Sequence, residues 1–512
     1  MSHLYDSSPR VKKQTKKTQP NPLNLLRVPV PCHPASRRTI LCFAELGLRY
    51  LPVGAVQISG HPTGLDPGHR TVPVKKRVKR FSLIQEINME ELNSANSEFC
   101  FKFYKEIAKS KKHENIFFSP LSIMSAMGMV YRGASGNTAT QMGEVFLFNK
   151  VGKMVSYGES TPDTTCPGME QQALKTHYQV PFPKRAHLDE DVDTLNILPA
   201  FKALNAVINK PSSSYTLETA SNMYVEKTYP VKKGYVNDIK KYYEVQPESV
   251  NLAGDTENTR KKINGWVEDK TKNKIKNLVP EGALDQSTVM VLVNAIYFKG
   301  DWADKFSVQH TEEREFKMSK TSKKPVQMMF KRAKFNIAQV EEPGLAFKVL
   351  ELPYVNKDLS MIILLPNEIL DDSTGLEKLE REMTNENVSK WTNSDNMENT
   401  TVELFLPKFK MEESYDLKKT LSTMGMTDAF SQGSADFSGM SAKLDLYLSN
   451  VFFKAFVEVN EEGTEAAAAT AAVVTMRTAP ISVSFEANHP FLFLIRHNKT
   501  GSILFWGRFC SP

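Results

Sequence analysis

The stretch Val289–Phe298 reads VMVLVNAIYF and consists almost wholly of β-branched, aliphatic and aromatic residues. A strand with solvent on one face alternates apolar and polar residues, so a continuous apolar run is typical of a strand buried on both faces. We therefore expect residues 289–298 to form a central strand of a sheet. Outward from it, further strand patterns occur near residues 217–225, 347–352, 359–365, 401–406 and 444–459.

The C-terminus predicts a β-hairpin. FLFLI (Phe491–Ile495) and SILFWGRF (Ser502–Phe509) are two apolar runs joined by a turn through Asn498–Gly501. Helical patterns occur at residues 90–108, 119–131, 198–208 and 258–278. Because these helices and strands do not alternate as βαβ units, they predict an α+β fold with a largely antiparallel sheet core.

The net charge of +7 divides unevenly along the 512 residues. Residues 1–88 hold 15 Lys and Arg against 4 Asp and Glu, whereas the other 424 residues hold 50 against 54. The body is therefore mildly acidic, and we expect no general attraction of the body to nucleic acid. With 41% hydrophobic residues and no uninterrupted apolar run of about 18 residues, the composition predicts a globular protein without a membrane partner.

Residues 1–88 contain ten of the 28 prolines and no sustained apolar period. This composition predicts a disordered basic extension ahead of a folded domain at residues 89–512. The cluster VKKRVKR (Val74–Arg80) fits a nuclear import signal, a processing site, a solvated basic run or the product of an upstream start codon. If the extension bound nucleic acid, deleting residues 1–88 would abolish a salt-dependent gel shift.

The sequence contains no recognisable signature of catalysis. GxSxG, HExxH, GxxxxGK[ST] and GxGxxG are all absent, so we do not expect an enzyme. One of the five cysteines, Cys166, lies in a polar segment at residues 149–195 that predicts a long interhelical loop, and none has CxxC spacing. We therefore expect neither disulfides nor a metal or cofactor, and the absence of a secretory signal favours the cytoplasm.

The unusual segment is Glu461–Pro480, EEGTEAAAATAAVVTMRTAP, which lies between two strand patterns and is too long for a hairpin turn. A helix or a flexible tether is one interpretation. Read as a strand, it has one uncharged face, small at its first five positions, formed by Thr464, Ala466, Ala468, Thr470, Ala472, Val474 and Met476. The opposite face holds Glu465, Ala467, Ala469, Ala471, Val473 and Thr475. No proline interrupts residues 464–478, so this loop is chemically able to become a central strand of roughly 46 Å over Thr464–Arg477.

Several motifs together resemble the serpins, and within them the ovalbumin-like intracellular branch. The resemblance covers about residues 89–512. It rests on NIFFSPLSI (115–123), NAIYFKGDW (294–302), LELPY (350–354), LSMIILLP (359–366), FVEVNEEGTEAAAATAA (456–472) and HPFLFLIRHNKTGSILFWGRFCSP (489–512). The resemblance implies three β-sheets, about nine helices and an exposed reactive-centre loop at residues 461–480.

In such proteins the loop acts as a suicide substrate for a serine protease and inserts into the main sheet after cleavage. The resemblance places the hinge at Glu462, Gly463, Thr464, Glu465, Ala466, Ala467, Ala468 and Ala469. The scissile bond normally follows the fourteenth residue after the hinge glycine, which gives Arg477–Thr478 here. An arginine at this position predicts trypsin-like targets, whose primary pocket pairs a carboxylate with a guanidinium. Cleavage after Met476 instead would favour chymotrypsin-like targets.

The chain departs from the family pattern where the sheet must open. Most relatives have a histidine ten residues before the hinge glycine, bonded to the strand asparagine, here Asn294. This chain has Phe453 at that position, so Asn294 needs another partner, for which Ser119 or Ser122 is the candidate. By the same resemblance, Trp302 belongs to the region where insertion begins.

Two alternatives remain open at the level of sequence. The first is an inhibitor of trypsin-like or other proteases, monomeric but able to form loop-sheet polymers. The second is a non-inhibitory serpin that is cleaved without trapping. We expect a cytoplasmic or nuclear protein, with secretion possible by a route that needs no signal peptide. The sequons that begin at Asn387, Asn399 and Asn498 would matter only after entry into the secretory pathway.

Overall fold

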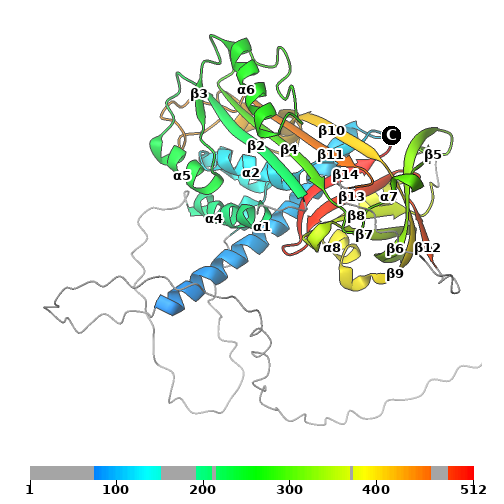
Figure 1. Cartoon of the computed structure of the whole chain (residues 1–512). Helices are drawn as coiled ribbons and strands as arrows, with labels where there is room; N and C mark the ends of the chain where they lie inside the picture. Colours follow the sequence, from blue (N-terminus) through cyan, green and yellow to red (C-terminus); the bar gives the residue numbers. More distant parts are fainter. Residues whose placement is uncertain (1–73, 152–191, 210–214, 370–372, 463–481) are drawn as a thin grey trace, which may run out of the picture. The chain divides into compact units, whose positions relative to one another are not determined.

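The computed structural model describes residues 74–151, 192–209, 215–369, 373–462 and 482–512 (Figure 1). These residues all belong to one compact unit, Val72–Pro512. The side chains are described from Asn88 onward and, after the gap that follows residue 151, from Ile197 onward. Most of the predicted extension at residues 1–88 and of the predicted loop at 149–195, with Cys166, lies outside the described residues, so both remain predictions.

The strand predicted at residues 289–298 is β4 (Met290–Gly300), and it lies at the centre of a five-stranded sheet. The order is β10 (Phe409–Asp416), β11 (Asn450–Val459), β4, β2 (Tyr215–Glu226) and β3 (Glu248–Val250). Ten of the eleven residues of β4 are buried. One face of the sheet packs against α6 (Thr256–Lys270) in a small separate core, and the other belongs to the main core. The apolar run therefore reflects burial on both faces, as predicted.

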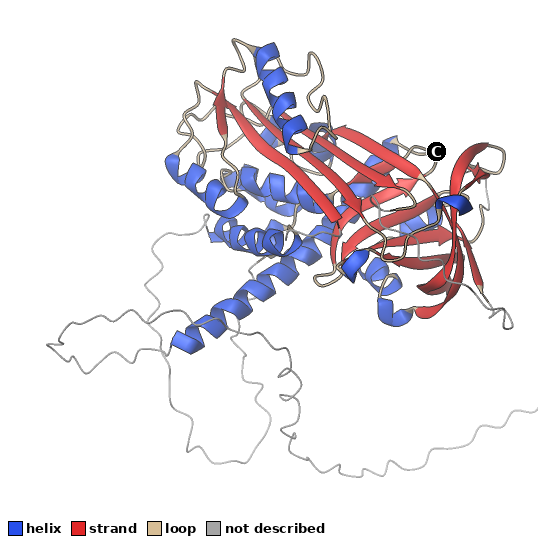
Figure 2. Cartoon of the chain, in the orientation of Figure 1, coloured by secondary structure: helices blue, strands red, loops and turns tan. Residues whose placement is uncertain are grey.

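A second hydrogen-bonded network contains nine strands in the described part of the chain (Figure 2). Its main path runs β1 (Ile116–Phe118), β14 (Ser502–Phe509), β13 (Phe491–His497), β8 (Leu359–Pro366), β7 (Leu345–Pro353), β6 (Lys323–Glu342), β9 (Glu398–Pro407) and β12 (Val483–Glu486), and β5 (Glu312–Lys317) pairs with β6. The 20-residue β6 pairs with β7 through residues 336–342 and with β9 through residues 328–337. The resemblance implies three separate sheets. In the structure, two of these groups of strands form one network because both pair with the long strand β6.

Nine α-helices occur among the described residues, which fits the expected number. They are α1 (Val74–Ser110), α2 (Pro120–Tyr131), α3 (Gly136–Val145), α4 (Val192–Ile208), α5 (Lys233–Tyr243), α6, α7 (Glu377–Glu382), α8 (Asn385–Trp391) and α9 (Leu417–Thr423). The N-cap of α2 is Ser119, whose side chain accepts a hydrogen bond from the Ser122 amide, and Pro120 occupies the first turn. Helix α1 begins at Val74, ahead of the predicted start near residue 90.

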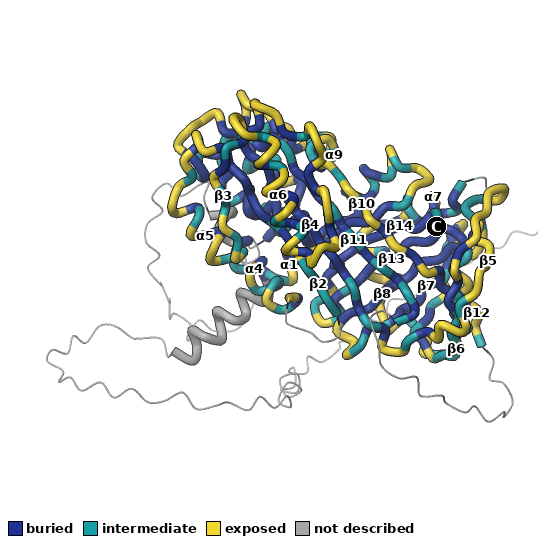
Figure 3. The backbone as a smooth tube through the Cα atoms, turned by 45° about the horizontal axis from the view of Figure 1, so that its top comes forward, coloured by how far each residue is buried: buried dark blue, intermediate teal, exposed yellow. Residues whose placement is uncertain are grey.

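The main core is built around α1, α2 and the C-terminal hairpin, which lies at the centre of the buried region (Figure 3). Strand β14 is buried at all eight residues, and it pairs with both β13 and the short β1 near the start of the domain. Arg508 of β14 is 1% exposed, and its guanidinium donates hydrogen bonds to the backbone oxygens of Lys111 and Glu114 and to the Glu380 carboxylate. The hairpin predicted from the sequence is confirmed.

Candidate functional site: the seam between β4 and β11

The central strand pair of the five-stranded sheet is unusual because it is parallel. β11 pairs with β4 over eight positions, from Asn450 opposite Val291 to Val457 opposite Phe298. The neighbouring pairs, β10 with β11 and β2 with β4, are antiparallel. We call the eight parallel pairs of β4 and β11 the seam. A parallel ladder is slightly less stable per residue than an antiparallel one, so the seam is the weaker junction in the centre of this sheet.

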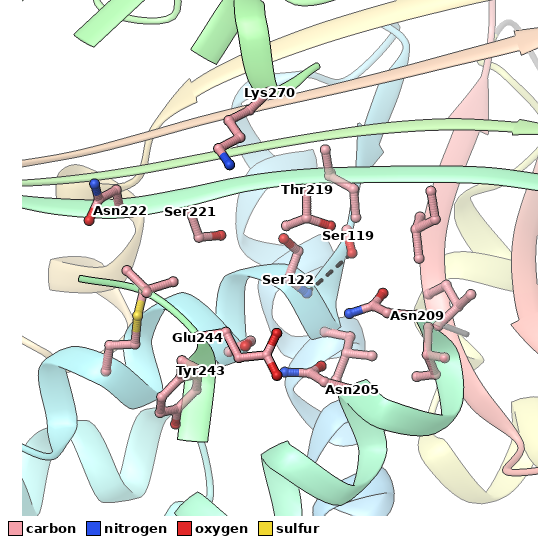
Figure 4. A pocket seen from close by; sticks show the side chains of 18 of the residues that line it. Ser119, Ser122, Asn205, Asn209, Thr219, Ser221, Asn222, Tyr243, Glu244 and Lys270 are labelled. Atoms are coloured by element: carbon pink, nitrogen blue, oxygen red, sulfur yellow. Dashed lines mark hydrogen bonds between the residues drawn. The ribbon is translucent and has the colours of Figure 1, made fainter. Parts of the chain in front are cut away.

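Asn294 lies in the middle of the seam and is 1% exposed. Its Nδ2 donates to Ser122 Oγ of α2 at 2.8 Å and to Ser221 Oγ of β2 at 2.5 Å, and Ser122 Oγ lies 2.9 Å from Oδ1. Ser119, the other candidate partner, instead caps α2 (Figure 4). The amide of Asn294 is therefore satisfied by α2 and β2 without the missing histidine.

Phe453 stands directly opposite Asn294 in the parallel ladder and is fully buried. Its ring lies 6.2 Å from that of Tyr415 in β10, the strand on the other side of β11 from β4. A phenyl ring cannot accept the hydrogen bond that a histidine could share with an amide. As a result, among the described residues no side-chain hydrogen bond joins β4 directly to β11 between the two ends of the seam. Lys454 of β11 donates instead to the Lys276 carbonyl after α6, at 2.9 Å.

Both ends of the seam, in contrast, are tied by hydrogen bonds. At the start, the amide of Val289 donates to Ser449 Oγ at 3.0 Å, and the amide of Ser449 donates to the Met290 carbonyl at 2.9 Å. At the end where the predicted hinge begins, Trp302 Nε1 donates to the Asn460 carbonyl at 2.9 Å. The indole of Trp302 is held by stacking on Tyr354, with ring centroids 4.6 Å apart.

The backbone just before the predicted hinge is held further by Glu461 and Glu462. The carbonyl of Glu461 accepts from the Phe306 amide at 2.9 Å, and that of Glu462 accepts from the Trp302 amide at 3.4 Å. The Glu461 carboxylate pairs with Lys408 Nζ at 2.9 Å and accepts from Thr311 Oγ1 at 2.9 Å. Burial alone raises the pKa of this carboxyl, but the hydrogen bonds from Lys408 and Thr311 outweigh burial and hold the pKa below its ordinary value.

The predicted loop connects the two sheets. It leaves β11 after Glu462, the last described residue of the hinge, and the chain is described again from Ser482, just before β12. β12 pairs in parallel with β9 of the nine-stranded network. The predicted reactive bond, Arg477 and Thr478, and the hinge residues Gly463, Thr464, Glu465, Ala466, Ala467, Ala468 and Ala469 lie outside the described residues.

The sequence interpretation did not include two contributors to this site. Ser221 was not identified as a partner of Asn294, because only the β2–β4 register places the two residues opposite each other. Glu461 was grouped with the loop, yet its carboxylate anchors the end of β11 to Lys408 and Thr311. The position of Glu461 beside the predicted hinge could have suggested a structural role. Its partners, Lys408 and Thr311, are too distant in sequence to be recognised from the sequence alone.

These features define a class of protein. Residues 94–512 match the family model described as "Serpin (serine protease inhibitor)", and the chain belongs to the serpin family. Serpin B10 of Sorex araneus is 46% identical over 424 residues, which are 83% of this chain and 100% of that relative. Plasminogen activator inhibitor 2 of Homo sapiens is 45% identical over the same share of both chains. These relatives place the chain in the ovalbumin-like branch.

Solved structures agree with this assignment. Uncleaved ovalbumin is 34% identical with a TM-score of 0.68, over 82% of this chain and 100% of that structure. Maspin is 32% identical with a TM-score of 0.69, over 83% of this chain and 100% of that structure. The predicted serpin fold is therefore confirmed. In the described part of the chain, no helix is long and apolar enough to cross a membrane, and no group of three His, Cys, Asp or Glu residues could hold a metal ion.

Proposed function

We propose that this protein inhibits trypsin-like serine proteases as a suicide substrate, with cleavage at Arg477–Thr478 followed by insertion of the loop into the seam. The observation that carries the proposal is the parallel pairing of β4 and β11, with the loop attached directly to the end of β11. A segment that folds back after Glu462 runs antiparallel to β11 and therefore antiparallel to β4 as well. Insertion thus replaces one parallel ladder by two antiparallel ladders, which are more stable per residue.

The residues of the loop support this step. Fourteen residues from Thr464 to Arg477 span roughly 46 Å when extended, which exceeds the length of the seam of eight residue pairs, roughly 26 Å. Their uncharged face, small over its first five positions, can enter the main core without burying a charge, and the unbroken N–H groups can join both ladders. The native sheet then stores free energy that is released when a strand enters the seam.

The covalent step follows the ordinary chemistry of serine proteases. The protease serine Oγ attacks the carbonyl carbon of Arg477, its proton passes through the protease histidine to the departing amine of Thr478, and the Arg477–Thr478 bond breaks. An ester between the protease and Arg477 remains. Insertion of the loop carries the attached protease along the sheet before water can hydrolyse the ester.

Specificity is assigned to Arg477 because a guanidinium pairs bidentately with a carboxylate in the primary pocket of a trypsin-like protease. The relative plasminogen activator inhibitor 2 is by name an inhibitor of plasminogen activator, which supports a protease as the partner. We further propose that the protein acts as a cytoplasmic monomer, that it is not itself an enzyme, and that it can form loop-sheet polymers when the seam opens without cleavage.

The test is incubation with trypsin followed by denaturing electrophoresis. We expect a covalent adduct that resists denaturation, together with release of the fragment Thr478–Pro512. Arg477→Ala removes the pairing charge and should abolish the adduct, whereas the control Arg477→Lys keeps a cation and should retain it. Clean cleavage without an adduct would refute inhibition and support the non-inhibitory alternative, and an adduct that survives Arg477→Ala would refute the assigned bond.

A matched pair of loop variants separates insertion from cleavage. Ala468→Glu places a charge on the face that would turn into the core, where an unpaired charge is costly, so this variant should be cleaved without trapping. Ala469→Glu adds the same side chain on the opposite face, creates no new trypsin site and should still trap trypsin. Equal adduct yields for the two variants would contradict the assigned faces of the inserted strand.

A further inference from the structure

Basic residues crowd the start of α1, the first described element of the fold (Figure 1). VKKRVKR (Val74–Arg80) supplies the first seven residues of the helix, and five of them are Lys or Arg. The first turn contains no acidic residue. Because cations near a helix N-terminus oppose the helix macrodipole, this start is electrostatically unfavourable. Residues 74–80 are therefore the part of α1 that should unwind most easily.

A second signal for a helix start follows directly in the sequence. Ser82 and Gln85 have the spacing of a capping box, in which a serine at the N-cap and a glutamine three residues later each bond to the other's backbone amide. The next charged residue is Glu86, and residues 81–101 contain no Lys or Arg. An acidic residue near the N-terminus of a helix suits the macrodipole. A helix that began at Ser82 would thus have a more favourable start than one that begins at Val74.

The bond that separates these two helix starts follows a dense basic motif. Arg77, Lys79 and Arg80 occupy the fourth, second and first positions before the Arg80–Phe81 bond. This pattern suits a protease whose subsites carry carboxylates, because each cation can pair with one of them. No other stretch of the sequence has the pattern Arg-x-Lys-Arg, and the related Arg10–Lys13 ends in a lysine.

We propose that Arg80–Phe81 is a processing site, cleaved after the first turns of α1 unwind by a serine endoprotease specific for clustered basic residues. Unwinding is needed because a peptide that pairs with a protein as a strand must be extended. The bond lies between Val72, where the compact unit begins, and Leu92, the first residue of α1 in the main core among the described side chains. Cleavage leaves the family match at residues 94–512 intact. The inference does not rest on the proposed function.

The reaction at this bond is an ordinary hydrolysis. The protease serine Oγ attacks the carbonyl carbon of Arg80, its proton passes through the protease histidine to the departing amine of Phe81, and the peptide bond breaks. Water then hydrolyses the ester and regenerates the protease. The products are a carboxylate at Arg80 and a new amino terminus at Phe81.

Cleavage reverses the sign of the net charge. Residues 1–80 hold 15 Lys and Arg against 3 Asp and Glu, a net of +12. Residues 81–512 hold 50 against 55, a net of −5, whereas the whole chain carries +7. A segment with a large positive charge is attracted to polyanions, and a negatively charged body is not. Processing therefore releases the domain from any polyanion that holds the basic extension.

The cleavage test incubates the full-length protein with furin, a serine protease that requires arginine at the first and fourth positions before the bond. Intact mass and N-terminal sequencing should find one new terminus, at Phe81. Arg80→Gln should lower the initial rate at least about 100-fold, because the subsite carboxylate is left unpaired. The control Lys75→Gln removes the same charge at the sixth position before the bond and should be cleaved as the wild type. No cleavage at this bond in the wild type, or equal rates for the two variants, would overturn the site.

A second pair of variants tests the role of the helix. Val74→Asp places a carboxylate in the first turn of α1, where it stabilises the helix start, and should slow cleavage severalfold. Thr71→Asp adds the same charge ahead of the helix and should leave the rate unchanged. Equal rates for Val74→Asp and Thr71→Asp would overturn the claim that α1 must unwind before cleavage.

The charge reversal is tested by a gel shift at low salt with a DNA duplex of random sequence, with the protein followed through a label at its C-terminus. The full-length chain should shift the duplex, and the furin product should not, because the basic residues that release counterions are gone. Arg80→Gln treated with furin should still shift it. If the product binds as tightly as the full-length chain, the release from polyanions is refuted, while the mass measurement still decides the site.

Discussion

The seam and the C-terminal hairpin are both largely buried, yet they are connected in opposite ways. The β13–β14 hairpin is antiparallel, and Arg508, near the end of β14, ties it to the backbone after α1 and to Glu380. The seam is parallel, and the side chain of its central polar residue, Asn294, bonds to α2 and β2 rather than to β11. Burial therefore does not distinguish the two junctions. The direction of the ladder and the placement of the side-chain hydrogen bonds do.

The largest expected effect is at the hairpin. Arg508→Ala leaves Glu380 and two backbone carbonyls without the guanidinium and should lower the free energy of unfolding by about 3–5 kcal/mol, as removal of one partner of a buried ion pair does. The control Arg381→Ala, whose side chain is 70% exposed beside Glu382, should change it by less than about 1 kcal/mol. Urea denaturation measures both. Similar urea midpoints for the two variants would show that Arg508 does not hold the hairpin in place, and the contrast between hairpin and seam would be lost.

The packing of the hairpin gives the next effect. A Cβ at Gly507 would lie 2.4 Å from two ring carbons of Phe493, so Gly507→Ala should destabilise the protein by about 1–3 kcal/mol. The control is Gly265→Ala in α6, where a Cβ meets nothing within 4 Å and helix propensity predicts a gain of about 1 kcal/mol. Thermal unfolding should move the midpoints in opposite directions. A midpoint for Gly507→Ala at or above that of the wild type would show that the hairpin is less rigid than we infer.

Asn294 tests the seam itself. Asn294→Ala removes the hydrogen bonds from β4 to Ser122 and Ser221, so it should cost about 1–3 kcal/mol and speed incorporation of an added synthetic peptide with the sequence Thr464–Arg477, which is followed by the rise of the thermal midpoint. Asn264→Ala is a matched control, because this buried asparagine in α6 makes two hydrogen bonds to Val279, away from the seam. It should cost a similar amount and leave the rate of peptide incorporation unchanged. Equal rates for the two variants would mean that Asn294 does not restrain the sheet.

The smallest effect concerns the end of the seam at Glu461. Since its pKa is lowered in the folded protein, its contribution is complete above the ordinary value of 4.5 and is lost as the pH falls through the lower folded value. Acidification below 4.5 should therefore lower the protection of the Phe306 amide, which donates to the Glu461 carbonyl, when its exchange rate is compared with the intrinsic rate at the same pH. Glu461→Gln should speed exchange at neutral pH by an amount equivalent to about 1 kcal/mol or less, and should weaken the acid response. If Glu461→Gln responds to acid as strongly as the wild type does, the response belongs to another titratable group.

The sequence predicted the parts of the fold whose pattern is local. β4, the C-terminal hairpin and α2 were recognisable because each carries its own apolar run or cap. β6 was not predicted, because Lys331, Arg332 and Lys334 separate two groups of buried residues. These are Val326, Met328 and Met329 on one side and Phe335 and Ile337 on the other. The strand expected from residue 444 begins at Asn450, since the residues before it form turns and extended backbone.

Only those members of the site could be predicted whose residue type and local motif pointed to a role. Ser122 was named from its place in the helix that follows the SP motif, and the structure shows it bonded to Asn294. Ser221 needed the strand register, and the role of Glu461 needed the positions of Lys408 and Thr311. Contacts between residues this far apart along the chain leave no periodic signal in a sequence.

The pairing of β1 with β14 also bears on how the protein is made. Residues 116–118 near the start of the domain find their strand partner only in residues 506–508, and Asn115 accepts hydrogen bonds from the amides of Cys510 and Ser511. Residues 506–508 leave the ribosome long after residues 116–118, so the central network cannot close until the C-terminal hairpin has been made. The first helices must wait with apolar surface exposed while all the strands between them are synthesised. This interval gives chaperones a defined period in which to act, and a chain cut before residue 506 should fail to fold.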